Sequence, residues 1–452
     1  MSLLNLLSIA RTALLTHQRA MMVTAQNVAN ANTPGYCRQR LNIVTATPAG
    51  TEKGLLGRGV TDEGIERLRN LFFDASYRQQ SGLLGGSSTL RDFLAQIEAA
   101  VNEPSDTGVA AAMSGLFQAF GDLANDPTSG TNRDMVRSSA RRFVQQLNQL
   151  DGQIEATLLN AVERMRSEVD QANTITNSIA DLNRQILAAG GNAPDLQDQR
   201  DTLVDRLSGM LSVRVLNRED GTIAVMGGDT LLVDGVNAQT LVLRGLGGGG
   251  YGIGLENGTG TIDPKAGSLK ALSDLTSTVL PGARNQLDTF VQAIVTEVNA
   301  IHQTGYTLAG VTNTDFFDPA GLTAGTIRLA DAIEASGDNI AAGGTNDPGD
   351  NTVALQLAGL GSVPIGSLGG RSLVDYYADF ASSIGVNGQN AERDSDIYQA
   401  MVDQADTQRS SMSGVSIDEE MVNLIAQQEA YAAAARLIQV ADEAIQTLLE
   451  MV

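Results

Sequence analysis

The two ends of this chain each carry an apolar residue at every seventh position, and this pattern constrains the fold more than any other feature. Near the start the series is Leu7, Leu14, Met21 and Val28, and Leu3 belongs to the alternate positions. Near the end the series is Ile417, Leu424, Tyr431, Ile438 and Ile445, with Met421, Ala435 and Leu449 in the alternate positions. Apolar residues that alternate at spacings of three and four form one narrow stripe on a helix, as in a coiled coil. We therefore predict a helix at each end that buries its stripe against a partner.

The two terminal segments also carry opposite charge. Residues 1–51 contain four arginines and no acidic residue, whereas residues 413–452 contain seven acidic residues and one arginine. Opposite charges favour pairing of the two ends with each other or with copies of the chain. The alternative is two ordinary amphipathic helices packed on a globular core. The segment "SIDEE" places Ser416 at the N-cap of the second helix and Glu419 three residues later, which is a capping box.

The middle of the chain predicts a mainly α fold with a β insert. Helical periodicity runs from residue 131 to about 188 and recurs at 196–211 and 287–301, with shorter helices at 88–102, 107–125, 372–384 and 391–412. Between them, residues 212–264 alternate apolar and polar residues and contain the turn signals Asp220-Gly221 and Gly227-Gly228. The fold class is therefore terminal coiled-coil-like helices, a long-helix bundle and a small outer β-rich domain.

The same patterns suggest domain boundaries. We predict a discontinuous terminal-helix assembly domain at 1–60 and 413–452, and a helical bundle domain at 61–211 and 265–412. The bundle includes an irregular lobe at about 305–370, which is rich in Gly, Asn and Asp. The β-rich outer insert occupies 212–264. Because the chain leaves through helices and returns through helices, its two ends are expected to lie together.

Composition argues against nucleic-acid binding, an internal disulfide, membrane insertion and a cleaved signal peptide. The 452 residues carry a formal net charge of −22, so nucleic acid is not an expected partner. The single cysteine, Cys37, rules out an internal disulfide. No run is long and apolar enough for membrane insertion, and the start lacks the basic region of a cleaved signal peptide. We expect that, if the protein leaves the cell, it does so without such a signal.

No motif predicts catalysis, a cofactor or a metal. A G-x-G-x-x-G pattern occurs at Gly245, Gly247 and Gly250, but no helical period follows it, and a dinucleotide site requires a helix there. His17 and His302 each stand alone on a helical pattern, without a second ligand at i+3 or i+4. We therefore expect no catalytic, cofactor-binding or metal-binding residues. An enzyme on a mixed α/β fold is the alternative, and loss of nucleotide binding on replacing Gly245 and Gly247 would support it.

The first helical pattern ends in the stretch "NVANANTPGYCRQR". Thr33 precedes a proline and is pushed out of the helical region, and Pro34-Gly35 suits the central positions of a type II turn. Asn30 and Asn32 can hydrogen-bond the last helix carbonyls or the turn backbone. We further expect Tyr36 to anchor the exit from the turn, and Arg38 and Arg40 to face acidic residues, with Asp418 to Glu420 as candidates.

Together the two ends resemble a known family. "NVANANTPGYCRQR" is similar to the N-terminal motif of flagellar rod, hook and hook-associated proteins, and "DEEMVNLIAQQEAYAAAARLIQVADEAIQTLLEMV" is similar to their C-terminal helix. The long helices at 131–188 and 285–303, with "QRDTLVDRLS" and "FFDP", resemble the hook-associated protein 1 family. Hook protein or a distal-rod protein of the same group is the alternative, and a coiled-coil scaffold unrelated to flagella shares only the stripes.

The resemblance implies a structural subunit without enzymatic activity. Such a subunit is exported by the flagellar type III apparatus, forms the hook-filament junction and polymerises through its paired terminal helices. The implied partners are copies of itself in a helical array, hook protein, the second hook-filament junction protein and an export chaperone. In this family the chaperone binds the C-terminal region, which maps onto the stripe from Leu424 to Leu449.

Overall fold

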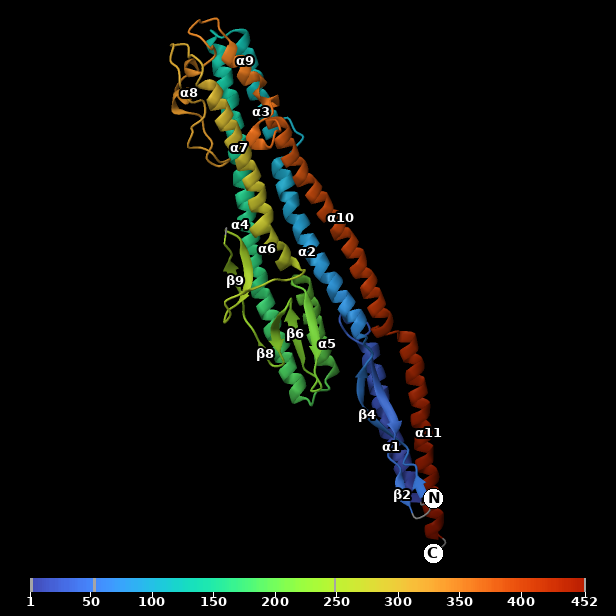
Figure 1. Cartoon of the computed structure of the whole chain (residues 1–452). Coiled ribbons are helices and arrows are strands. Elements are labelled where there is room, and N and C mark those ends of the chain that lie inside the picture. The colour runs from blue at the N-terminus through green and yellow to red at the C-terminus, as the bar shows by residue number, and fades with distance from the viewer. Residues whose placement is uncertain (1–2, 52–53, 248, 451–452) are drawn as a thin grey trace. The chain divides into compact units, whose positions relative to one another are not determined.

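The computed structural model describes residues 3–51, 54–247 and 249–450. Helices account for most of these residues, and several short strands form small antiparallel sheets (Figure 1). The helices are α1 (Leu3–Ala29), α2 (Leu71–Val101), α3 (Val109–Asn125), α4 (Gly130–Ala188), α5 (Pro194–Met210), α6 (Ser268–Asp274), α7 (Leu280–His302), α8 (Asp331–Ala335), α9 (Thr352–Gly359), α10 (Leu373–Ser413) and α11 (Ile417–Glu450). The strands are β1 (Gln39–Thr45), β2 (Ala49–Thr51), β3 (Gly54–Leu56), β4 (Val60–Arg67), β5 (Val213–Asn217), β6 (Ile223–Gly227), β7 (Thr230–Asp234), β8 (Asn237–Ala238), β9 (Leu241–Gly245), β10 (Tyr251–Leu255) and β11 (Thr261–Ile262).

The predicted fold class is confirmed, with helices before and after a β-rich insert. The helical period from residue 131 to 188 corresponds to one helix, α4, and the two periods predicted at 372–384 and 391–412 form the single helix α10. α4 ends where Gly190 and Gly191 adopt positive φ angles of 82° and 87°. Their N–H groups donate to the carbonyls of Leu187 and Ile186 at 3.1 and 2.9 Å, which satisfies the last turn of the helix.

The chain divides into two compact units. The terminal unit comprises residues 1–83, 171–240 and 398–452, and the middle unit comprises residues 84–170 and 241–397. Helices α2, α4 and α10 therefore contribute residues to both units. The three-part division into assembly domain, bundle and outer insert stays a prediction.

In the terminal unit, α1 lies beside α11 and also packs on a hairpin that sequence patterns did not predict (Figure 1). Strands β1 and β4 pair antiparallel from Gln39 opposite Arg67 to Thr45 opposite Val60, with a bulge between Asn42 and Ile43. Ala20 and Val23 of α1 form a small core with Leu41 of β1, flanked by the half-buried Ile43 and Ile65. The hairpin follows the "NTPGY" turn directly, and its packing on α1 sets the direction of the chain after that turn.

A four-stranded sheet in the order β5-β6-β7-β8 is fastened to α4 by one buried amide. The side chain of Asn183 is fully buried. Its Nδ2 donates to the carbonyls of Ile223 and Gly235 at 3.0 and 2.7 Å, and its Oδ1 accepts the Ile223 N–H at 3.2 Å. The same Oδ1 also accepts a hydrogen bond from Arg200 of α5 at 3.0 Å. One residue thus joins the helix, the sheet and α5.

The middle unit has an aromatic core. Phe143 and Phe290 have ring centroids 6.4 Å apart, and Phe290 and Tyr377 have centroids 5.5 Å apart, so α4, α7 and α10 meet at these rings. Strands β9 and β10 pair with Gly245 opposite Tyr251. Gly245 is therefore the last residue of β9, and Gly247 and Gly250 lie in the connection to β10, in which residue 248 is not described. Strand β10 rather than a helix follows the pattern, so this stretch cannot present a helix N-terminus to a dinucleotide.

His302, at the end of α7, is fully buried and uses both ring nitrogens. Its Nδ1 lies 2.6 Å from the Thr314 carbonyl, and its Nε2 accepts the Ala341 N–H at 2.8 Å. Because Nε2 accepts this bond, the ring is neutral, with its proton on Nδ1. Burial lowers the pKa of His302 to about 4 from its ordinary value of 6.5.

We expect the middle unit to lose stability as the pH falls from 6.5 to 4. In this range the unfolded chain binds a proton at His302 that the folded chain excludes, so the free energy of unfolding falls by about 3 kcal/mol in all. Urea unfolding of the wild type and of His302→Gln at several pH values checks this. The variant should show a flatter pH dependence, and an identical slope would contradict the assignment.

Candidate functional site

The turn after α1 has the geometry that its sequence predicts. The Tyr36 N–H donates to the Thr33 carbonyl at 3.2 Å across Pro34-Gly35, and Gly35 has a φ of 81°, as the third residue of a type II turn requires. The Asn30 side chain donates to the Gln26 carbonyl at 3.1 Å and so serves the end of α1. A Cβ added at Gly35 would collide with Thr202 Oγ1 of α5, so the turn packs directly on that helix. Asn32 is exposed.

Asn27, in the last turn of α1, connects four chain segments. Its side chain is 1% exposed. Oδ1 accepts the Tyr36 hydroxyl at 2.9 Å and the Gln39 N–H at 3.0 Å. Nδ2 donates to the Gln39 carbonyl at 2.8 Å and to Glu420 Oε2 of α11 at 2.9 Å. The expected anchoring role of Tyr36 therefore acts through Asn27, and the same amide binds the start of the C-terminal helix.

Glu420 is the acidic residue that the basic segment contacts most closely. Its side chain is 3% exposed, and Arg38 Nη2 lies 2.7 Å from its Oε1. Arg38 Nη1 also pairs with Glu419 at 2.9 Å, where the Glu419 side chain is 64% exposed. The prediction that Arg38 faces this acidic group is thus confirmed. Arg40 also faces an acidic residue, but the candidate partner was wrong: β1 directs Arg40 to the surface, where it pairs with Glu66 of β4 at 3.3 Å.

Cys37 is buried between the turn and α5. Its N–H donates to Asp198 Oδ2 at 3.0 Å, and its thiol lies 3.3 Å from the Leu68 carbonyl. Burial, with the nearby Asp198 carboxylate, raises the pKa of the Cys37 thiol to about 11. The thiolate is the reactive form, so this cysteine is chemically inert in the folded chain.

We expect native Cys37 to react with iodoacetamide at pH 8 about a hundredfold more slowly than the same residue in urea, because both the thiolate fraction and the access of the reagent fall on folding. Mass spectrometry of timed samples measures both rates. The urea-unfolded chain is the control. Comparable rates in the two states would mean that the segment after the turn is not docked in solution.

The structure distributes the predicted stripe residues over several environments. On α1, Leu7, Leu14, Met21 and Val28 are half-buried, and the side chain of Leu3 lies outside the described residues. On α11, Leu424, Ala435, Ile438 and Ile445 are half-buried. The stripe residues that remain exposed are Ile417 at 48%, Met421 at 43%, Tyr431 at 37% and Leu449 at 72%.

Small residues are prominent among the buried residues of α1 and α11. Ala434 and Ala441 are the buried apolar residues of α11, and Ala10 and Ala20 are among those of α1. His17 Nδ1 lies 2.7 Å from Gln427 Oε1 across the contact. The face that α11 turns to α1 therefore follows Glu420, Leu424, Gln427, Ala434, Ile438, Ala441 and Ile445. This face shares Leu424, Ile438 and Ile445 with the predicted stripe. The other stripe residues point to a different side of the helix.

A second cluster, which the sequence reasoning missed, surrounds α5. Three carboxylates on one face of this helix pair with four arginines from other segments of the terminal unit. The carboxylates are Asp198, Asp201 and Asp205, and the arginines are Arg67, Arg69, Arg78 and Arg409. The available signal was the spacing of three and four in "DLQDQRDTLVDR", which places the three acids on one face.

The described residues contain neither a candidate membrane span nor a cluster that could hold a metal ion. None of the helices there has a stretch long and apolar enough to cross a membrane. Within the same residues, no group of three His, Cys, Asp or Glu side chains converges in a way that could hold a metal ion.

Three family models match the chain. Residues 94–317 match the helical domain of flagellar hook-associated protein FlgK, residues 406–451 match the C-terminal model of the flagellar basal body rod FlgEFG proteins, and residues 7–36 match the flagella basal body rod protein model. The two rod models cover the paired helices α1 and α11. Together with the interlocked chain ends, these matches define a structural protein of the bacterial flagellum.

Individual relatives narrow the class. Flagellar hook-associated protein 1 of Bacillus subtilis is 31% identical, over 98% of this chain and 97% of its own length. The chain belongs to the flagellar hook-associated protein 1 family. The proteins of the same name from Salmonella typhimurium and Escherichia coli are 26% and 25% identical, over 69% of this chain and 59% and 60% of their lengths. This membership places the chain in the flagellum at the hook-filament junction.

A solved structure has the same fold. The flagellar hook junction protein FlgK from Burkholderia pseudomallei superposes with a TM-score of 0.66 and 16% identity, covering 76% of this chain and all of that one.

Proposed function

We propose that this chain is exported by the flagellar type III apparatus and polymerises through its paired N- and C-terminal helices to form the hook-filament junction. Its partners are copies of itself, hook protein, the second junction protein and an export chaperone. The observation that carries the proposal is the apolar surface that α11 leaves uncovered after it pairs with α1.

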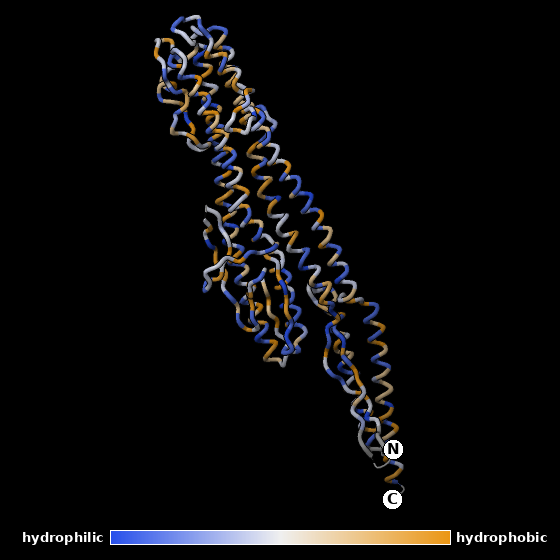
Figure 2. The backbone as a smooth tube through the Cα atoms, viewed as in Figure 1, coloured by the Kyte–Doolittle hydropathy of each residue, from blue (hydrophilic) through white to orange (hydrophobic). Residues whose placement is uncertain are grey.

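This surface lies on the side of α11 away from α1. Val422 is 67% exposed, Ile425 is 52% exposed and Val440 is 56% exposed. Val422 and Val440 are eighteen residues apart, which is about five helical turns, so they lie on one line along the helix. Figure 2 shows hydrophobic residues recurring along α11. Exposed apolar residues gathered on one face are typical of a protein-protein contact.

The stripe residues left exposed in the single chain extend this surface. Ile417, Met421, Tyr431 and Leu449 flank the α1 contact, and we propose that neighbouring subunits cover them. A contact between different faces of identical subunits repeats without closing and gives a helical array. Before assembly, the same apolar residues of α11 are available to the export chaperone.

Replacing Val440 by aspartate should abolish junction assembly without unfolding the subunit. The side chain is exposed in the single chain, so circular dichroism should not change, but a carboxylate buried between subunits lacks a partner. Complementation of a strain that lacks the gene, scored by electron microscopy and by flagellin shed into the medium, measures assembly.

The matched control is Leu159→Asp, which places the same charge at an exposed leucine of α4 that is 60% exposed. This variant should build normal junctions. Normal filaments with Val440→Asp would sink the proposed contact, and failure of both variants would point to a general loss of export.

A further inference from the structure

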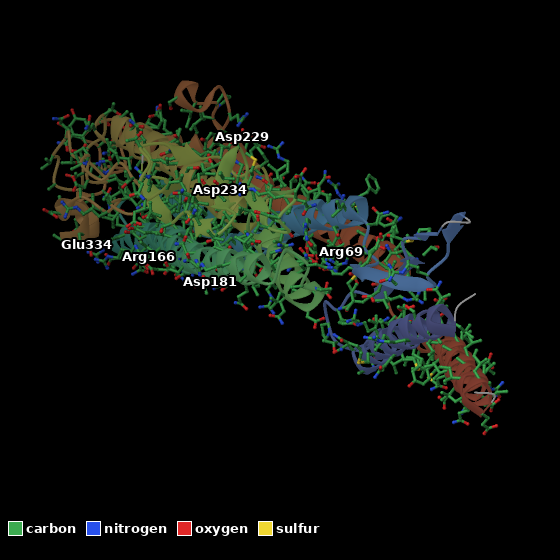
Figure 3. All side chains as sticks on the ribbon, turned by 90° about the horizontal axis from the view of Figure 1, so that it is seen from below. Arg69, Arg166, Asp181, Asp229, Asp234 and Glu334 are labelled. Carbon is green, nitrogen blue, oxygen red and sulfur yellow. The ribbon has the colours of Figure 1, made fainter. Side chains whose placement is uncertain are left out.

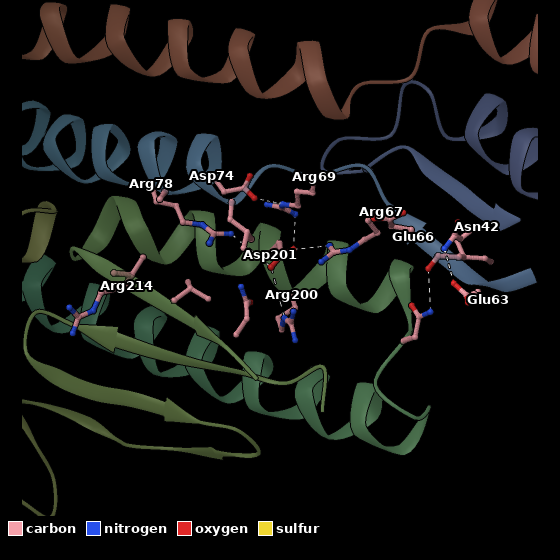
Figure 4. Close-up of a pocket in the computed structure, with 18 residues that line it drawn as sticks. Asn42, Glu63, Glu66, Arg67, Arg69, Asp74, Arg78, Arg200, Asp201 and Arg214 are labelled. Carbon is pink, nitrogen blue, oxygen red and sulfur yellow. Dashed lines mark hydrogen bonds and ion pairs between the residues drawn. The ribbon is translucent and has the colours of Figure 1, made fainter. Parts of the chain in front are cut away.

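A cavity of about 650 Å³ in the terminal unit lies between β4, α2, α5 and β5 (Figure 4). Five arginines and four carboxylates line it, which makes the net charge of its lining +1 in a chain of net charge −22. The arginines are Arg67, Arg69, Arg78, Arg200 and Arg214, and the carboxylates are Glu63, Glu66, Asp74 and Asp201.

Three of these arginines are neutralised by hydrogen-bonded carboxylates. Arg67 lies 2.8 Å from Asp198 and from Asp201, Arg69 lies 2.5 Å from Asp74, and Arg78 lies 2.7 Å from Asp205. The opposite charges raise the pKa of Arg67 and of Arg69 against the effect of burial. These pairs are structural and hold α5 against β4 and α2.

Arg200 is different because no carboxylate hydrogen-bonds to it among the described residues. Its side chain is 3% exposed, and its Nη1 donates to Asn183 Oδ1 at 3.0 Å and to the Gly221 carbonyl at 2.8 Å. Within the described part of the chain its Nε has no hydrogen-bond partner, and Asp201 Oδ1 is 3.9 Å away. A buried guanidinium without a bonded anion carries a large desolvation cost. Accordingly, burial and the neighbouring arginines lower the pKa of Arg200 to about 10.

We propose that this cavity binds a small oxyanion, either inorganic phosphate or a carboxylate group, with the Arg200 guanidinium as a principal donor. Arginine recognises both groups through charge-assisted hydrogen bonds. Figure 4 shows Arg200 on the opposite side of α5 from Asp74, which belongs to α2. Asp74 Oδ1 is buried, has no hydrogen-bond partner among the residues that the structure describes, and repels an anion. The ligand therefore lies near Arg200, away from α2.

Isothermal titration calorimetry of the full chain with sodium phosphate tests this, with sodium chloride holding the ionic strength constant. A separate titration with sodium acetate distinguishes an inorganic anion from a carboxylate. We expect saturable binding of at least one of them and a loss of affinity of about tenfold or more in Arg200→Gln. The matched control is Arg184→Gln, which removes an arginine of α4 that is 62% exposed and should leave the affinity unchanged.

A second variant tests the site without touching its charge. Val215 of β5 lines the cavity and is half-buried, so Val215→Phe should fill the space beside the arginines and weaken binding similarly. Arg200→Gln also loses the hydrogen bonds to Asn183 and Gly221 and could therefore fail to fold. In that case Val215→Phe alone tests whether the cavity is the binding site. Absence of saturable heat with both anions, or full affinity in the two cavity variants, would overturn the proposal.

Discussion

Replacing Asp201 by asparagine should lower the free energy of unfolding of the terminal unit by about 3–5 kcal/mol. Asp201 is 6% exposed, and its carboxylate lies 2.8 Å from Arg67 and 2.6 Å from Arg69. The positive charges around it, with Arg69 and Arg67 first, hold the pKa of Asp201 below its usual range despite burial. A neutral amide leaves these guanidinium groups buried with too little opposing charge.

Urea unfolding followed by circular dichroism measures the loss. The control is Asp181→Asn on α4. Asp181 lies at the surface (Figure 3), where its side chain is 60% exposed and pairs with Arg184. An exposed pair of this kind contributes about 0–1 kcal/mol. Equal effects of the two substitutions would mean that the charges around α5 are solvated and that the cluster does not hold the unit together.

Replacing Glu420 by alanine should release the start of α11 from the segment after α1. The substitution removes the buried acceptor of Arg38 and Asn27 and leaves both donors without it. Loss of one partner of a buried pair costs about 3 kcal/mol or more. Amide hydrogen exchange should show faster opening in the first turns of α11, and cleavage by protease between α10 and α11 should accelerate.

Glu419→Ala is the internal control for this prediction, because Glu419 pairs with the same arginine from an exposed position. Its effect should stay below about 1 kcal/mol. If Glu419→Ala and Glu420→Ala open α11 to the same extent, burial of Glu420 is not the cause of the coupling. If neither variant changes exchange, the two chain ends are held by the helix contact alone.

Local patterns predicted the helices well and the tertiary pairs poorly. The uninterrupted period from residue 131 to 188 specifies α4, because no proline or paired glycine breaks it before Gly190-Gly191. The β1–β4 hairpin escaped prediction because its strands contain charged residues and only part of one face is buried, on Ala20 and Val23 of α1. Its strand pairing depends on contacts between distant residues, which periodicity does not report.

The contact face of α11 shows the same limit. The stripe of large apolar residues predicted pairing of the terminal helices, and α1 and α11 do lie side by side. However, the side facing α1 contains Ala434 and Ala441, while Met421 and Leu449 stay exposed. Hydropathy ranks large residues as buried, whereas close approach of two helices favours small ones. The role of the exposed residues in an assembled array remains a proposal.

Most of the helices, the β-rich insert and the turn at Pro34-Gly35 follow from the sequence, because each depends on neighbours within a few residues. The pattern nevertheless missed residues 71–87 of α2 and divided α10 into two helices. The opposite charges of the two termini are a property of the sequence itself. The charge pattern also predicted that Arg38 faces the acidic start of α11, as the structure shows. The tertiary structure was needed to show that Glu420 rather than Asp418 is the buried partner, that Arg40 turns to Glu66, and that no carboxylate among the described residues hydrogen-bonds to Arg200. These outcomes depend on which side chains lose water when distant segments meet, and burial sets the energy of a charge far more than its place in the sequence.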